Sequence, residues 1–78
     1  MSFSEVVKKM NDCYGENIQS CYYSHSDNSS SVLFIFSEDF DLRDKASEIL
    51  FIIQDGSIDY EFNISFDYDD FSVTVDNN

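Results

Sequence analysis

The residue types of a catalytic triad lie close together in this sequence, at a spacing that does not suit catalysis. Ser24, His25 and Asp27 are near neighbours, and His25 is the single histidine of the chain. The members of a Ser-His-Asp triad come from separate parts of a fold, because three side chains must converge on one point. The surrounding segment, residues 24–31, is rich in serine, which is typical of a solvated turn. We therefore interpret His25 as a loop histidine and predict that the protein is not an enzyme.

Acidic side chains are the ligands that a hard metal ion prefers, but their spacing here does not form a metal-binding loop. Asp67, Asp69 and Asp70 resemble part of a calcium loop, and a second such fragment holds Asp39 and Asp41. Neither run has the glycine and the closing glutamate that an EF-hand requires. The chain also lacks a glycine-rich phosphate loop. We predict no metal site and no cofactor.

The two cysteines, Cys13 and Cys21, are too few for the disulfide framework of a small secreted protein. They also lack the companion histidines and cysteines of a zinc site. We expect reduced, partly buried thiols, with a Cys13–Cys21 disulfide as the alternative. The N-terminal residues mix charged and apolar side chains, unlike a signal peptide, and no stretch has the length and apolarity of a membrane span. The predicted location is the cytoplasm.

Apolar periodicity predicts a first helix followed by a hairpin. The residues at helical spacing near the N-terminus are Phe3, Val6, Val7 and Met10. Gly15 stands where a C-terminal cap would, so we expect the helix over residues 3–14. Residues 18–24 are β-prone and residues 32–36 form an unbroken apolar run. Two strands joined around residues 25–30 are the simplest interpretation.

The next segment predicts a second helix with a clear start. Asp41 can cap it, and Asp44 then favours the positive end of the helix dipole. The apolar stripe that follows consists of Leu42, Ala46, Ile49, Leu50 and Ile53. Asp55-Gly56 ends the pattern. Phe51 and Ile52 widen the stripe beyond what one flat contact needs, which suggests a second covered surface, and a homodimer through this patch is an alternative to a monomer.

The last third alternates strictly between apolar and polar residues, which predicts a strand over residues 58–69. Its apolar members are Ile58, Tyr60, Phe62, Ile64, Phe66 and Tyr68. Asp69 and Asp70 indicate a turn, and residues 71–76 alternate again in a closing strand. The sequence therefore predicts a single α+β domain over residues 1–78, with its elements in the order α-β-β-α-β-β. The simplest architecture packs two helices on one face of a four-stranded antiparallel sheet, with the strand order open and a duplication of two α-β-β halves suggested.

Charge is the strongest functional signal. Sixteen Asp and Glu stand against four Lys and Arg, giving a formal net charge of −12 at pH 7. Phosphates and anionic lipids repel such a chain, so we predict no direct binding to nucleic acid or to a membrane. Cationic protein surfaces attract it, and many of these serve to hold DNA or RNA. The four basic residues (Lys8, Lys9, Arg43 and Lys45) lie in the predicted helices, and residues 54–78 hold seven acids and no base.

The alternation of the third strand predicts where part of this negative charge lies in the fold. If its apolar side chains face the helices, Asp59, Glu61, Asp67 and Asp69 lie on the open face of the sheet. Carboxylates two residues apart on a strand are separated by about 6.6 Å, which is similar to the phosphate spacing of a nucleic-acid strand. The predicted partner-binding residues are Asp59, Glu61, Asp67, Asp69, Asp70, Asp76 and Tyr68. Tyr22 or Tyr23, whichever faces outward, would add an aromatic contact.

The length, the net charge and the acidic run of residues 59–70 resemble small acidic inhibitors from phages and bacteria. This class includes anti-CRISPR and anti-restriction proteins that imitate DNA, and immunity proteins that neutralise nuclease toxins. The resemblance is one of type, since such proteins share no common motif. It implies a non-catalytic inhibitor, such as a phage anti-CRISPR protein in the host cytoplasm, that covers the basic surface of a nucleic-acid-binding protein or nuclease. An immunity protein is the first alternative, and an acidic adaptor domain with incidental charge is the second.

Overall fold

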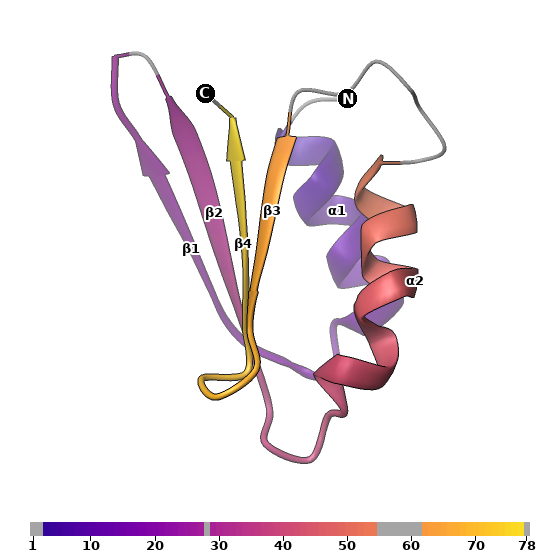
Figure 1. Ribbon diagram of the computed structural model, residues 1–78. Coiled ribbons are helices and arrows are strands. Elements are labelled where there is room, and N and C mark those ends of the chain that lie inside the picture. The colour runs from indigo at the N-terminus through magenta and orange to yellow at the C-terminus, as the bar shows by residue number, and fades with distance from the viewer. Residues whose placement is uncertain (1–2, 28, 55–61, 78) are drawn as a thin grey trace.

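The computed structural model describes residues 3–27, 29–54 and 62–77, and its elements follow the predicted order. They are helix α1 (Phe3–Tyr14), strands β1 (Ile18–His25) and β2 (Ser30–Phe36), helix α2 (Leu42–Gln54), and strands β3 (Phe62–Asp67) and β4 (Ser72–Asn77). Both helices cover the same face of a four-stranded antiparallel sheet and leave the other face open (Figure 1). The predicted α+β architecture is therefore confirmed. Within the described ranges, no helix is long and apolar enough to cross a membrane.

The strand order is β1-β2-β4-β3, so the inner strand of each hairpin meets the other at the centre of the sheet. β2 and β4 pair antiparallel from Ser30↔Asn77 to Ile35↔Ser72. Each α-β-β half thus contributes one outer and one inner strand, and the topology is symmetric about an axis between β2 and β4. The duplication of two halves that the sequence suggests stays a prediction.

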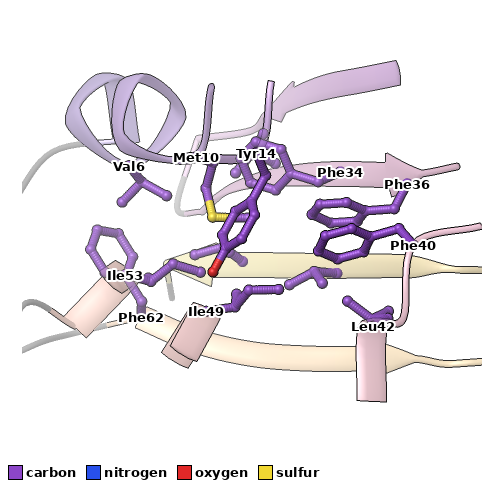
Figure 2. Close-up of a cluster of buried hydrophobic side chains, with 13 residues drawn as sticks. Val6, Met10, Tyr14, Phe34, Phe36, Phe40, Leu42, Ile49, Ile53 and Phe62 are labelled. Atoms are coloured by element: carbon purple, nitrogen blue, oxygen red, sulfur yellow. The ribbon is translucent and has the colours of Figure 1, made fainter. Parts of the chain in front are cut away.

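The register divides the sheet into a buried face and an open face. Because paired residues of antiparallel strands share a face, the pairs Val32↔Val75 and Phe34↔Val73 lie together under the helices. The helices add six buried side chains from two stripes: Val6, Met10, Tyr14, Leu42, Ile49 and Ile53. Figure 2 shows these side chains converging between the layers. Burying each large apolar side chain contributes about 1.5–3 kcal/mol, so this layer supplies most of the stability of the fold.

Local signals set the end of α1 and the start of α2 where the sequence predicted them. At the end of α1 the Gly15 N–H donates to the Asn11 carbonyl (2.9 Å). A side chain at Gly15 would bring its Cβ within 2.5 Å of that carbonyl oxygen, so only glycine fits this close approach. At the start of α2 the Asp41 carboxylate accepts the N–H of Asp44 (3.2 Å), which confirms the predicted N-cap.

An aromatic cluster anchors the connection between β2 and α2. Phe36 and Phe40 stack with their ring centroids 4.6 Å apart, and Tyr14 meets both rings edge-on (Figure 2). The Tyr14 hydroxyl donates a hydrogen bond to Glu48 on α2. Burial, followed by the hydrogen bond to the Glu48 carboxylate, raises the pKa of Tyr14 well above its ordinary value. Because Phe40 is held in the core, residues 37–41 run along the end of the molecule in a fixed position.

Two sequence expectations need correction. The third strand ends at Asp67 rather than at residue 69, because the Asp67 carboxylate accepts the backbone N–H groups of Asp69 and Asp70 (both 3.2 Å) and so forms the turn. The predicted beginning of this strand, residues 58–61, lies outside the described residues, as does the predicted helix end at residues 55–56. Cys13 and Cys21 are free thiols, as expected, but both residues are exposed rather than mostly covered. Cys21 shares the helix-covered face with Phe34, but it lies on the outer strand β1, where the cover is incomplete.

Candidate acidic protein-binding surface

Two connections that are far apart in the sequence lie side by side at one end of the sheet. They are the β2–α2 connection (residues 37–41) and the β3–β4 turn (residues 68–71), and Figure 1 shows both below the strands. The Phe36 N–H donates to the Phe71 carbonyl (2.8 Å), which ties them together. Phe71 has a φ of 55°, a left-handed conformation that is uncommon for a bulky residue. The α1–β1 connection joins the same end, because the Asn17 carbonyl accepts the N–H of Ser37 (2.8 Å).

These three connections, together with the first turn of α2 and the last residue of β3, carry half of the acids of the chain. We call the resulting surface the acidic end, and it consists of Glu16, Glu38, Asp39, Asp41, Asp44, Asp67, Asp69 and Asp70. All eight side chains are exposed. Concentrating like charges at one end of a small domain costs free energy of folding, so the arrangement needs a reason beyond solubility.

Part of that reason is structural. Asp41 caps α2, and Asp67 forms the β3–β4 turn, as described above. Asp44 lies in the first turn of α2, where a negative charge favours the helix dipole. These three acids would be useful to the fold whatever the protein binds.

The other acids have no such role. In the part of the chain that the structure describes, the carboxylates of Glu38, Asp39, Asp69 and Asp70 make no hydrogen bond and no ion pair. They project from two loops that the sheet holds next to each other. Their negative charge is available to a partner.

The cations nearest to the acidic end are already engaged. The Arg43 guanidinium lies over the ring of Tyr68, 4.4 Å from its centroid. Tyr68 in turn stacks on Phe66 (5.8 Å between centroids). Lys45 lies 3.9 Å from the Glu48 carboxylate, in a pair that is largely exposed. Among the described residues, neither cation makes an ion pair with the acidic end, so the field of the eight carboxylates extends into solvent.

A shallow depression of about 280 Å³ separates the two loops. Its walls are formed by Glu38, Asp39, Phe40, Asp41, Leu42, Arg43, Tyr68 and Phe71. The lining thus combines three acidic side chains, three aromatic side chains and the guanidinium of Arg43. Such a depression suits a long cationic side chain, whose methylene stem can lie on aromatic rings while its head meets carboxylates.

In the described strands, the open face of the sheet carries fewer carboxylates than the predicted row, of which Asp59 and Glu61 lie outside the described residues. The acids of this face in those strands are Asp67 and Asp76, and the neighbouring positions of β2, β3 and β4 are uncharged: Leu33, Ile35, Asn63, Ser65, Ser72 and Thr74. Asp76 is half-buried beside Ser31.

The predicted site residues therefore divide into four groups. Asp67, Asp69 and Asp70 come together at the acidic end, although Asp69 and Asp70 lie in the turn and not on a strand. Tyr68 lies beside them, covered by Arg43 and not displayed as an open aromatic contact. Asp76 lies near the opposite end of the sheet, paired with Ser31, which in turn lies near the β1–β2 turn. Asp59 and Glu61 lie outside the described residues.

Sequence reasoning missed the contribution of Glu16, Glu38 and Asp39. The run of acids from Glu38 to Asp44 is visible in the sequence, but its pattern there indicates only a helix start at Asp41 and Asp44 and a fragment of a calcium loop at Asp39 and Asp41. Its position next to Asp69 and Asp70 follows only from the pairing of β2 with β4, which no local pattern predicts.

The remaining chemistry-bearing side chains do not form a catalytic group in the described residues. His25 Nδ1 lies 2.7 Å from Ser30 Oγ across the β1–β2 hairpin, and both groups are near its exposed tip. Burial raises the pKa of Cys21 above its ordinary value, which disfavours the reactive thiolate. Within the described ranges, no three His, Cys, Asp or Glu side chains are grouped so as to hold a metal ion.

Comparisons of the chain with protein-family models, with curated proteins and with solved structures gave no match.

Proposed function

We propose that the protein is a non-catalytic inhibitor that binds the basic nucleic-acid-binding surface of a partner protein through its acidic end. The observation that carries the proposal is the set of carboxylates on two neighbouring loops, Glu38 and Asp39 with Asp69 and Asp70. They are exposed, lack intramolecular partners in the described chain, and are held by a core that fixes both loops.

The mechanism follows from electrostatics. The field of the acidic end attracts a Lys/Arg-rich surface and speeds the encounter. On contact, the carboxylates replace the phosphates that the partner would otherwise hold, so nucleic acid is excluded by competition. A positive side chain that enters the depression beside Tyr68 would add a desolvated, specific contact to this long-range attraction.

Affinity capture with matched baits tests the proposal. The acidic-end variant carries Glu38→Gln, Asp39→Asn and Asp69→Asn. The remote variant carries Glu5→Gln, Asp12→Asn and Asp27→Asn, so both variants lose the same number of charges. Asp12 pairs with Lys8 only at the surface, 3.4 Å apart, and such pairs add little stability.

We expect the native protein and the remote variant to retain the same basic nucleic-acid-binding protein from a host-cell lysate, and to release it as the salt concentration rises. The acidic-end variant should bind it at least about tenfold more weakly, a loss of about 1.4 kcal/mol. Equal losses in the two variants would mean that only the net charge matters. Retention of a partner without any dependence on salt would contradict the proposal.

A further inference from the structure

Strand β1 forms an outer edge of the sheet, and it differs from the rest of the molecule in both exposure and charge. In the described sheet it pairs with β2 on one side and has no strand neighbour on the other. Its last five residues, from Cys21 to His25, are all exposed. Tyr22 and Tyr23 are 58% and 57% exposed, and they are two of the three large exposed hydrophobic side chains in the described chain. The third, Phe51, lies on helix α2.

The whole β1–β2 hairpin is almost free of charge. Residues 17–37 contain one acid, Asp27 in the turn, whereas all the other acids of this strongly negative chain lie outside the hairpin. Proteins commonly protect an edge strand with lysine, proline or inward-pointing charge, since its unpaired backbone groups otherwise accept another strand. β1 has none of these residues, and its one irregularity, near Gln19, leaves Ser20 to His25 in regular register. The opposite edge strand, β3, carries Asp67.

We propose that β1 pairs antiparallel with β1 of a second copy of this chain, so that two four-stranded sheets join into one. A basic partner would be drawn to the acidic end, not to an uncharged edge, so the hairpin offers little to it. Two copies of a chain with a net charge of −12 repel each other, and they can approach closely only through a neutral surface. The β1 edge is such a surface, and a two-fold pairing makes it complementary to itself.

The direction of pairing follows from the position of the charge. Ile18 lies opposite Phe36, so each β1 strand begins beside the acidic end of its own subunit. A parallel pair would bring the two acidic ends together. An antiparallel pair places them at opposite ends of a strand of eight residues, about 23 Å apart at a rise of about 3.3 Å per residue. This exceeds the screening length of about 8 Å at physiological salt, so the two ends repel each other weakly.

The register follows from the faces of the sheet. A two-fold axis perpendicular to the joined sheet places the helices of both copies on the same side of it. Residues that pair across the β1–β1 interface must therefore both point to the helix-covered face or both point to the open face. Tyr22 pairs with Leu33 on the open face and lies within the regular part of β1. Axes at Cys21, Tyr22 and Tyr23 all meet this condition. The proposed dimer places Tyr22 opposite Tyr22, where the two rings meet on the face that the helices leave open, with Ser20 opposite Ser24. This register directs Asp27 of one copy toward Glu16 of the other, so added salt strengthens the dimer.

Sedimentation velocity over a dilution series tests the dimer. We expect a monomer–dimer equilibrium for the native chain, strengthened by salt. Tyr22→Lys and Ser24→Lys, each on the open face of β1, should raise the dissociation constant at least about tenfold. Ser47→Lys, on the exposed side of α2, should leave the dimer intact. All three variants reduce the magnitude of the net negative charge equally, and this change by itself favours association. Dissociation by the two β1 variants alone would therefore identify the β1 edge as the interface. Circular dichroism checks that each variant is folded.

Oxidative cross-linking tests the register. In a chain with Cys13→Ser and Cys21→Ser, a cysteine at Tyr22 lies opposite its own copy across the axis, within the distance that a disulfide spans. The Tyr22→Cys chain should therefore form a covalent dimer, and the Ser24→Cys chain should not. A native chain that stays monomeric at every concentration and salt level would overturn the proposal. So would a dimer that Phe51→Ser dissociates and Tyr22→Lys does not. Binding of a basic partner is a separate result and stands or falls independently.

Discussion

Replacing Tyr14 by phenylalanine removes one oxygen from the junction between α1 and α2, and its effect on stability should depend on pH in a defined way. The Tyr14 side chain is 6% exposed, and its hydroxyl donates to Glu48. A hydrogen bond of this kind contributes about 1 kcal/mol net, because the Glu48 carboxylate is partly solvated. At pH 7 we expect the Tyr14→Phe chain to be less stable by about this amount.

The pH dependence comes from the raised pKa of Tyr14. In the unfolded chain the phenol has its ordinary pKa of 10.0, whereas burial and the Glu48 carboxylate raise the pKa in the folded chain. A group whose pKa is raised by folding keeps its proton in the folded state. Its stabilising effect is therefore complete below pH 10 and is lost as the pH rises above the unfolded pKa. One pH unit above the unfolded pKa, the free energy of unfolding of the native chain should have fallen by about 1.4 kcal/mol relative to that of Tyr14→Phe.

Urea unfolding of both chains at neutral pH and at a pH one unit above 10 measures this difference. The two free energies of unfolding should converge or cross in alkali, because phenylalanine has no proton to lose. Parallel curves over the whole range would refute the reasoning, since they would show that Tyr14 titrates alike in the folded and unfolded chains.

Three further predictions concern the fold. Gly15→Ala should lower the free energy of unfolding by about 1–3 kcal/mol, because its Cβ would lie 2.5 Å from the Asn11 carbonyl oxygen, and urea unfolding measures the loss. Asp41→Ala should cost about 1 kcal/mol through the lost N-cap, whereas Asp41→Asn should restore most of it; thermal unfolding compares the two. Phe34→Ala should cost about 3–5 kcal/mol because Phe34 is fully buried, and in a chain of this size calorimetry should find little cooperative unfolding left.

The sequence predicted the features of the fold that depend on neighbouring residues. Gly15 ends α1 because the close approach to Asn11 is a local constraint, and Asp41 begins α2 because its carboxylate reaches a backbone group three residues on. The alternating residues of β3 face the helices and the solvent as their period requires. The strand order was not predictable, because the pairing of β2 with β4 depends on contacts between distant segments.

In the candidate site too, the features that depend on neighbouring residues were predictable, and those that depend on contacts between distant segments were not. The excess of acids was evident in the sequence, but the alternation of β3 appeared to continue through Tyr68 and Asp69 onto the open face of the sheet. The hydrogen bonds from Asp69 and Asp70 to the Asp67 carboxylate end the strand before that point. Glu38 and Asp39 then join these residues because Phe36 pairs with Phe71 at the end of the sheet, and this contact is not encoded in either loop alone.

A displacement titration tests the central claim most directly. The basic partner obtained by affinity capture is first bound to a fluorescently labelled nucleic acid. The acidic 78-residue protein is then added stepwise while the anisotropy of the label is measured. The account predicts that anisotropy falls to the value of the free nucleic acid near one equivalent, that the remote variant does the same, and that the acidic-end variant requires at least about tenfold more. Unchanged anisotropy while the two proteins bind each other would contradict it, because the acidic end would then contact a surface other than the one that holds nucleic acid.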